Sequence, residues 1–384
     1  MLAPPSGTLP TTQTKDFSRV PKVNIDRSVF NRDHGLKTTM DSGYLVPIFI
    51  DEALPGDTFQ LDATGFGRLA TPINPFMDNL YIETFFFAVP NRLIWDNWEK
   101  FCGEQVNPGD STDYLIPQIT SATITEQTLF DYMGVPLNVS VNFNNLFGRA
   151  YNLIYNDWFR DENLQNSVTV DKDDGPDDIA DYVLLKRGKR HDYFTSALPW
   201  PQKGDAVTLP LGGDAPIYYD GTGADHILLE NNAGSTYGIA TSGSVAKIDT
   251  GTIPTPKSKM YADMSGTTSA TINQLREAFQ IQGLLERDAR AGTRYTEIVQ
   301  GHFGVTSPDA RLQRPEYLGG GKDRINVNPI PQTSSTDATT PQGNLSAYAT
   351  TGFSGHRFSK SFTEHSVIIG LACVYADLTY QQGL

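Results

Sequence analysis

Residues 80–89 read Leu-Tyr-Ile-Glu-Thr-Phe-Phe-Phe-Ala-Val, and Pro90 ends the run. The run is too short to cross a membrane, and its aromatic and β-branched side chains favour a strand. Apolar side chains occur on both faces of this strand, so both faces must be covered. We expect the protein's own sandwich to cover one face, and a flanking element or a neighbouring subunit to cover the other. Residues 366–375 form a second run of the same kind.

Two further strands are predicted before this run. Residues 44–50 form one, and Pro47 restricts it to a sheet edge or a bulge because proline has no backbone N–H to donate. Residues 58–63 alternate apolar and polar side chains, which predicts that Phe59, Leu61 and Ala63 face the core.

Helical patterns interrupt the strands in three places. Asn91 is a candidate N-cap for a helix that ends at Gly103 and carries Ile94, Trp95, Trp98 and Phe101 on one face. Residues 142–160 place apolar side chains on a single stripe. Thr271 followed by Gln274 predicts a capping box. Strands and helices do not alternate strictly, so an all-β fold with helical insertions is predicted rather than a parallel α/β fold.

Composition supports a β-rich protein with a large contact surface. The 384 residues include 34 Gly, 24 Pro, 20 Phe and 17 Tyr, and only 19% are charged. The net charge of −14 excludes chain-wide nucleic-acid binding but allows local basic patches. Cys102 and Cys373 are too few for a disulfide framework or a zinc site, and each is predicted to be a small buried hydrophobe. The N-terminus lacks the features of a signal peptide, which predicts a protein made without export.

Residues 1–16 are rich in Pro and Thr and predict an extended arm, followed by one domain over residues 17–384. Within that domain, residues 204–256 are rich in Gly, Thr, Ser and Asp and are interpreted as a surface insertion. Its only aromatic residues are Tyr218, Tyr219 and Tyr237. Residues 329–351 are predicted to be a second long loop for the same reason.

Three patterns that resemble catalytic or ligand sites lack essential parts. His191, Asp192 and Ser196 have the residue types of a hydrolytic triad, but no nucleophile-elbow motif surrounds the serine. Residues 319–322 read Gly-Gly-Gly-Lys without the spacing of a phosphate-binding loop. Residues 171–178 concentrate carboxylates, which indicates a solvated acidic turn or a cation site at a subunit interface. We therefore predict no catalytic residue, no protein-bound metal and no cofactor.

The only dense basic run holds Lys186, Arg187, Lys189 and Arg190. In an acidic chain such a run can contact phosphate, and Tyr193 and Phe194 nearby can stack on bases. The alternative is that the run pairs with the acidic residues just upstream.

Longer strings of sequence carry a family resemblance. The chain resembles the major capsid proteins of microviruses of the gokushovirus type, which are small icosahedral single-stranded DNA bacteriophages. The matching strings occupy residues 19–30, 33–39, 47–57, 71–78, 86–95, 158–163, 174–178, 187–196, 198–203, 304–317 and 376–382.

The resemblance implies an eight-stranded antiparallel jelly roll with long loops. It implies that copies of the chain assemble in the host cytoplasm into an icosahedral T=1 capsid around a circular single-stranded DNA genome. The 204–256 insertion is then expected to form surface protrusions for host attachment, and further expected partners are a small basic internal protein and a host surface receptor. Family members continue beyond Leu384, so the resemblance also implies a C-terminal truncation.

Phe85, Phe87, Trp95 and Trp98 are the predicted subunit-interface residues. A bacterial carbohydrate-binding β-sandwich is the alternative function, with Trp200 as a sugar platform. A glycoside hydrolase is a third hypothesis for the function, but this activity needs two convergent carboxylates that the sequence does not identify.

Overall fold

The computed structural model describes residues 26, 28–72, 78–208, 217–219, 227–230, 236–242, 245–249, 260–262, 271–306, 313–339 and 341–380. The chain divides into two units, Met1–Thr39 and Met40–Leu384. Residues 28–39 of the first unit contain no helix or strand. The predicted arm at residues 1–16 lies outside the described residues.

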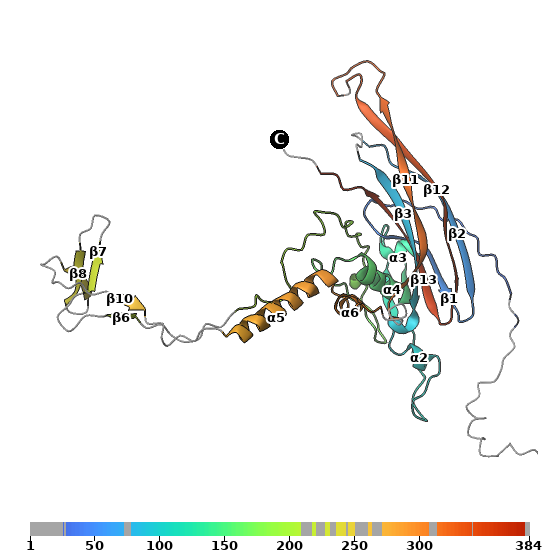
Figure 1. Ribbon diagram of the computed structural model, residues 1–384. Coiled ribbons are helices and arrows are strands. Elements are labelled where there is room, and N and C mark those ends of the chain that lie inside the picture. Colours follow the sequence, from blue (N-terminus) through green and yellow to red (C-terminus); the bar gives the residue numbers. More distant parts are fainter. Residues whose placement is uncertain are drawn as a thin grey trace, which may run out of the picture. The chain divides into compact units, whose positions relative to one another are not determined.

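The second unit is built on six antiparallel strands in the order β1-β13-β3-β11-β12-β2 (Figure 1). They are β1 (Val46–Ala53), β2 (Thr58–Arg68), β3 (Leu80–Pro90), β11 (Glu316–Pro331), β12 (Leu345–Ser361) and β13 (Ser366–Ala376). Early and late strands of the chain therefore pair, as a jelly-roll sandwich requires. The predicted all-β class is confirmed.

Strand β11 joins the two layers of the sandwich. Its first part, to Ile325, pairs with β3, and its last part, from Asn326, pairs with β12. Strands β12 and β2 then cover one face of β3, where Phe358 packs on Phe86 with ring centroids 5.4 Å apart. Phe59, Leu61 and Ala63 of β2 pack into this same cluster, as the alternating pattern predicts.

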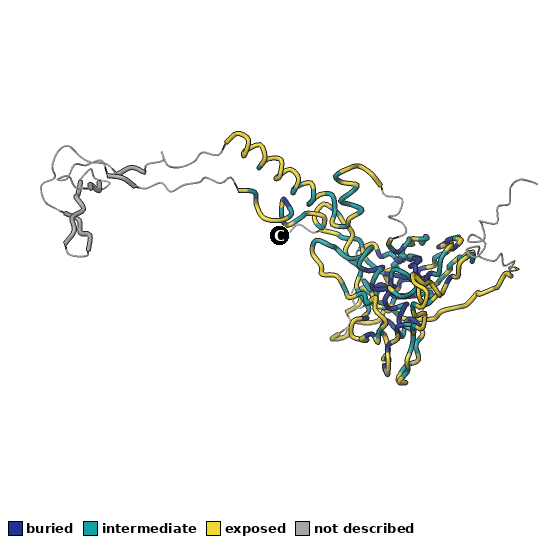
Figure 2. The backbone as a smooth tube through the Cα atoms, turned by 90° about the horizontal axis from the view of Figure 1, so that it is seen from below, coloured by how far each residue is buried: buried dark blue, intermediate teal, exposed yellow. Residues whose placement is uncertain are grey.

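The opposite face of β3 and β13 is covered by a helical layer (Figure 1). Phe87 and Val89 of β3 pack there against Tyr151 and Ile154 of α4 (Leu146–Ile154). The layer also contains α3 (Leu129–Tyr132), the π-helical turn η3 (Tyr155–Phe159), and the hairpin of β4 (Gln118–Thr123) and β5 (Ser140–Asn144). Both faces of the apolar strand are thus covered within one chain, by the sandwich and by a flanking element. Burial is greatest between these layers (Figure 2).

Pro47 lies where its chemistry predicts. Strand β1 is an edge strand, and its register with β13 shifts between Pro47 and Phe49.

The capping box is also confirmed, since Thr271 and Gln274 bond reciprocally at the start of α5 (Ile272–Ala291). Helix α6 (Tyr295–Phe303) follows α5.

Two helix predictions need correction. The 91–103 segment is not one helix but a 3₁₀ turn, η2 (Asn91–Leu93), followed by α2 (Trp98–Phe101). Asn91 is the first residue of that turn rather than its cap. The 142–160 helix begins only at Leu146, because Phe143 belongs to β5.

The predicted 329–351 loop is also wrong at both ends, because β11 continues to Pro331 and β12 starts at Leu345. In the 204–256 insertion and just beyond it, the described residues form β6 (Ile217–Tyr219), β7 (Ile227–Glu230), β8 (Thr236–Ser242), β9 (Val245–Asp249) and β10 (Met260–Ala262). Strand β6 pairs with β10, and β7, β8 and β9 form a three-stranded sheet. A further 3₁₀ turn, η4, spans Ile179–Asp181.

Candidate nucleic-acid interface and subunit contacts

The basic run lies beside the start of edge strand β1. The backbone N–H of Leu45 donates to the carbonyl of Leu185 at 2.9 Å, and that of Arg187 donates to Gly43 at 2.8 Å. The backbone therefore holds the run in place. Lys186, Lys189 and Arg190 are exposed, so their charges face solvent.

Arg187 is the anchored member of the run. Its Nη1 atom lies 2.6 Å from Oε2 of Glu83 on β3, and both side chains are largely buried. Its guanidinium also stacks over the rings of Phe85 and Tyr375, at 5.0 and 4.9 Å from their centroids. The ion-pair partner is therefore a strand residue and not the acidic run upstream.

The sheet brings one further cation, Lys322, and the rings of Tyr81 and Tyr375 to the same place. The Nζ atom of Lys322 on β11 lies 3.6 Å from the ring centroid of Tyr81 and 5.4 Å from that of Tyr375. The Arg190 guanidinium lies 5.6 Å from the Tyr375 ring. We define the basic patch as Lys186, Arg187, Lys189, Arg190 and Lys322. From the sequence, Lys322 was noted only as the end of the Gly-Gly-Gly-Lys pattern. Its place beside the basic run depends on pairing between strands far apart in the chain, which leaves no local signal in the sequence.

The triad-like residues form a turn and not a catalytic site. Asp192 Oδ1 accepts the backbone N–H groups of Phe194 and Thr195, both at 2.8 Å. The Ser196 hydroxyl donates to the backbone carbonyl of Asp192 and not to a histidine. The hydrogen bonds to the carboxylate of Asp192 lower its pKa to about 2, and the one from the Tyr380 hydroxyl contributes most.

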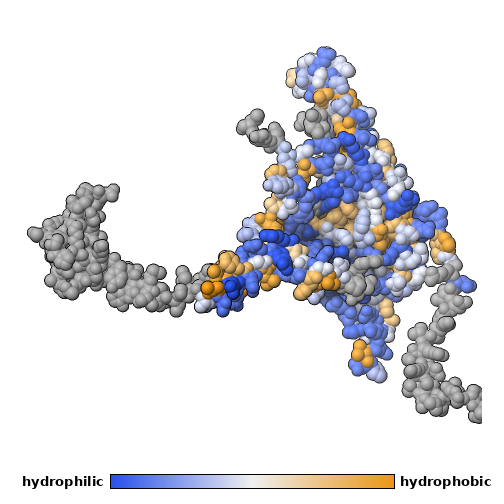
Figure 3. Space-filling model, in the orientation of Figure 1, coloured by the Kyte–Doolittle hydropathy of each residue, from blue (hydrophilic) through white to orange (hydrophobic). Residues whose placement is uncertain are grey.

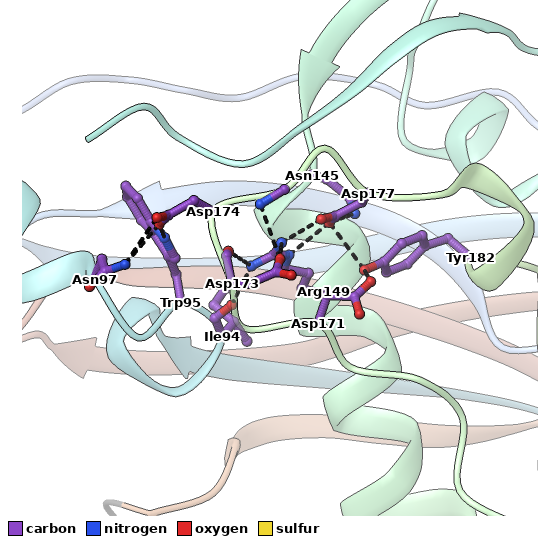
Figure 4. Close-up of polar contacts among 11 residues, drawn as sticks. Ile94, Trp95, Asn97, Asn145, Arg149, Asp171, Asp173, Asp174, Asp177 and Tyr182 are labelled. Carbon is purple, nitrogen blue, oxygen red and sulfur yellow. Dashed lines mark hydrogen bonds and ion pairs between the residues drawn. The ribbon is translucent and has the colours of Figure 1, made fainter. Parts of the chain in front are cut away.

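The acidic run encloses a buried cation that the sequence analysis missed (Figure 4). Arg149 of α4 is fully buried, and its Nε atom donates to Oδ2 of Asp177 at 2.7 Å. Its Nη1 atom donates to the backbone carbonyls of Ile94 and Asp173, at 3.1 and 2.8 Å. Burial acts to raise the pKa of Asp177, but hydrogen bonds from Arg149 and Asn145 and the Arg149 charge outweigh it and lower the pKa overall.

Neither reading of the acidic run anticipated this arrangement. The run is not simply a solvated turn, because Asp177 is buried. Among the described residues, no group of three or more His, Cys, Asp or Glu is placed to hold a metal ion. The cation at the centre of the run is the guanidinium of the protein itself.

The four predicted interface aromatics occupy different environments. Phe87 and Trp95 are buried within the chain, which leaves them no surface for a neighbouring molecule. The Trp95 indole N–H donates to Asp174 at 2.7 Å. Phe85 and Trp98 are half-buried and keep part of their surface. The proposal of a subunit contact is therefore retained for Phe85 and Trp98.

The tyrosines of the insertion lie in strands: Tyr218 and Tyr219 in β6, and Tyr237 in β8. Trp200, the sugar platform of the alternative function, is half-buried. Within the described ranges, no helix is both long and apolar enough to cross a membrane.

Comparisons with known proteins agree with the β-sandwich and with the resemblance. Residues 18–384 match the family model described as capsid protein (F protein). The capsid protein VP1 of Bdellovibrio phage phiMH2K is 50% identical over 386 aligned positions. The alignment covers 96% of this chain and 72% of the relative. The VP1 protein of Chlamydia phage 1 is 43% identical over 98% of this chain and 75% of its own length. The VP1 protein of Spiroplasma virus 4 is 38% identical over 96% of this chain and 73% of its own length.

These relatives are named for a structural role and not for an enzymatic activity. A family match over nearly the whole chain, with relatives well above 30% identity, decides the assignment. The chain belongs to the phage capsid protein (F protein) family, among the capsid proteins of gokushovirus-type microviruses.

Proposed function

We propose that copies of this chain form an icosahedral T=1 shell around a circular single-stranded DNA genome, and that the basic patch contacts this DNA. The observation that supports the genome contact is that the cations of this patch lie together, although the chain as a whole has a net charge of −14. Among the described residues, no carboxylate lies within ion-pair distance of Lys186, Arg190 or Lys322. These cations are thus available to a phosphate backbone.

The shell requires contacts between copies, and α5 supports such a contact. Ile272, Leu275 and Phe279 lie on one stripe of the helix and are exposed, at 69%, 38% and 68%. Of the residues in α5, only Ala289 is buried, and apolar surface along the helix is visible in Figure 3. A capsid subunit meets other copies of itself, and burial of this stripe between copies would stabilise the assembly. Phe85 and Trp98 are further candidate contacts.

The insertion is the proposed surface protrusion. This proposal is supported by the short strands of the insertion, which pair with one another and do not join the six-stranded sheet. A segment that adds nothing to the main sheet can vary without disturbing the sandwich. Tyr218, Tyr219 and Tyr237 are its candidate receptor contacts. A small basic internal protein and assembly in the host cytoplasm complete the proposal.

DNA binding is tested with the purified chain and a labelled single-stranded oligonucleotide at several salt concentrations. We expect the triple variant Lys186→Gln, Arg190→Gln, Lys322→Gln to bind more weakly. Its plot of log affinity against log salt should be shallower by about 2, since each lost phosphate contact removes about 0.7. A matched control neutralises Arg276 and Arg287 of α5 together with Lys172. Equal losses in both variants would show that the basic patch is not the DNA contact.

Assembly is tested by size-exclusion chromatography and negative-stain electron microscopy. We expect closed shells, and fewer of them for Phe279→Ser than for the wild type. A wild-type chain that stays monomeric under all conditions and binds glycans would instead support the carbohydrate-binding alternative.

A further inference from the structure

Three exposed aromatic rings lie together at the end of the basic run. Tyr193 and Phe194 come from the loop, and Tyr380 comes from the segment after β13. Their exposed fractions are 88%, 61% and 54%. The ring centroids of Phe194 and Tyr380 are 4.4 Å apart, and those of Tyr193 and Phe194 are 5.4 Å apart. We call these residues the aromatic triplet.

Two members of the exposed triplet, Phe194 and Tyr380, are held by hydrogen bonds to Asp192. Its Oδ1 atom accepts from the backbone N–H of Phe194, and its Oδ2 atom accepts from the Tyr380 hydroxyl. The Thr195 hydroxyl donates to the backbone carbonyl of Arg190 at 2.7 Å, which ties this turn to the basic run. The packed pair of Phe194 and Tyr380 is thus pre-organised, which reduces the conformational freedom that the pair loses when a ligand stacks on it.

The neighbouring charges indicate what kind of ligand fits. Lys189 and Arg190 come shortly before the turn, separated from Asp192 by His191, and both are exposed. A ligand that spans this surface meets cations at one end and flat apolar rings at the other. Single-stranded nucleic acid has that combination, because its phosphates bind cations and its unpaired bases stack on aromatic side chains. Duplex DNA offers the phosphates, but its bases are already stacked within the helix.

We propose that the aromatic triplet is a stacking site for unpaired bases, which makes this surface select single-stranded over double-stranded DNA. The inference rests on the proposed function and deepens it. The basic patch supplies affinity for any phosphate backbone, and the triplet supplies the preference for accessible bases. Another acidic copy of the chain is a poorer occupant, because only the DNA matches both the cations and the rings.

The test compares three labelled probes of equal length by fluorescence anisotropy with the full chain. They are an oligothymidine, an abasic strand that keeps the sugar-phosphate backbone, and a duplex. We expect the wild type to bind oligothymidine at least about fivefold more tightly than the abasic strand, the lower end of base–aromatic stacking. Equal affinity for these two probes would overturn the inference while leaving the proposed DNA contact standing. Failure to bind any probe would overturn both.

Variants locate the preference. The double variant Tyr193→Ala, Phe194→Ala should lose most of the preference for oligothymidine and keep its affinity for the abasic strand. Both rings are exposed, so the substitutions should leave the unfolding transition unchanged. Tyr348→Ala is the matched control, since it removes a ring that is 46% exposed on β12. If the double variant kept the wild-type preference but no longer formed shells, the triplet would be a contact between copies and the proposal would be wrong.

Discussion

Nε of Arg149 donates to Oδ2 of Asp177 at 2.7 Å, and the two side chains are 0% and 1% exposed. This buried pair joins α4 to the acidic run, and through the carbonyl of Ile94 it reaches the turn that follows β3. Removing charges from water is costly, so such a pair is stable only when its remaining donors and acceptors are satisfied. Here the guanidinium also donates to Asp173, and Asp177 also accepts from Asn145 and Tyr182.

Breaking this pair from either side should strongly destabilise the fold. For Arg149→Met or Asp177→Asn, we expect a loss of about 3–5 kcal/mol in the free energy of unfolding, because one buried charge is left without its partner. Urea denaturation measures the loss. Arg290→Met removes an exposed pair with Glu286 on α5 and should cost less than about 1 kcal/mol. Similar losses for Arg149→Met and Arg290→Met would contradict the structural role of the buried pair.

The same pair predicts an acid-dependent term in stability. The pKa of Asp177 lies below its ordinary value in the folded chain. The carboxylate therefore contributes stability that is fully present above the unfolded pKa of about 4, and that is lost as the pH falls through the folded value. The difference in unfolding free energy between the wild type and Asp177→Asn should be constant from about pH 8 to pH 5 and shrink below pH 4. A difference that grows in acid would have the wrong sign.

The two faces of the main sheet predict opposite outcomes for two phenylalanines. Phe86 of β3 is 1% exposed and packs between Phe49 and Phe358, whereas Phe66 of edge strand β2 is 78% exposed. Phe86→Ala should cost about 3–5 kcal/mol, because it removes buried surface and leaves a cavity. Phe66→Ala should change the free energy of unfolding by less than about 0.5 kcal/mol. If Phe66→Ala instead reduces shell yield without affecting stability, the edge strand takes part in a contact between copies.

The strands that the sequence predicts correctly are those whose burial is regular. β2 half-buries alternate residues, and β3 and β13 are buried on both faces, so their composition reports their position directly. The ends of β11 and β12 were mistaken for a loop because they pair only with each other there. The side chains that this part of β12 buries, Ala347 and Ala349, are small and give only a weak apolar pattern, and the Thr, Ser and Pro residues around them look like those of a loop.

The buried Arg149 could be recognised only in part. It lies three residues after Leu146 on the predicted apolar stripe, an unusual position for a charged side chain. Its carboxylate partner comes 28 residues later in the chain, and the sequence does not specify how that loop folds back. The basic patch could also be recognised from the sequence only in part. Lys186 to Arg190 are visible as a run, whereas Lys322 joins them only through the pairing of β11 with β3.

The two cysteines should differ in reactivity. Both were predicted to be buried, which is wrong for Cys102 because it is exposed just after α2. Cys373 lies inside β13, where burial raises the pKa of its thiol to about 11. A disulfide reagent at about pH 8 should modify one thiol in the native chain and two in urea. Cys102→Ser should leave no reactive thiol in the native state, and rapid modification of that variant would contradict the burial of Cys373.

Gly321 of β11 has no room for a side chain. A Cβ atom there would overlap the ring of His356 on β12. That ring cannot easily move, since Nδ1 lies 2.8 Å from Oγ1 of Thr84 and Nε2 lies 2.8 Å from Oδ2 of Asp323. Gly321→Ala should therefore destabilise the sandwich by about 1–3 kcal/mol, a typical cost of overpacking.

Gly352 on β12 provides the matched control for Gly321. A Cβ atom at this position meets nothing within 4 Å, and the residue lies in a strand that alanine tolerates. Gly352→Ala should be neutral or stabilise the chain by up to about 1 kcal/mol, because alanine loses less backbone entropy on folding. Thermal unfolding of the two variants side by side checks both expectations. Equal unfolding temperatures would mean that β11 and β12 are not held together closely at His356, because the two substitutions differ only in the space available to the new methyl group.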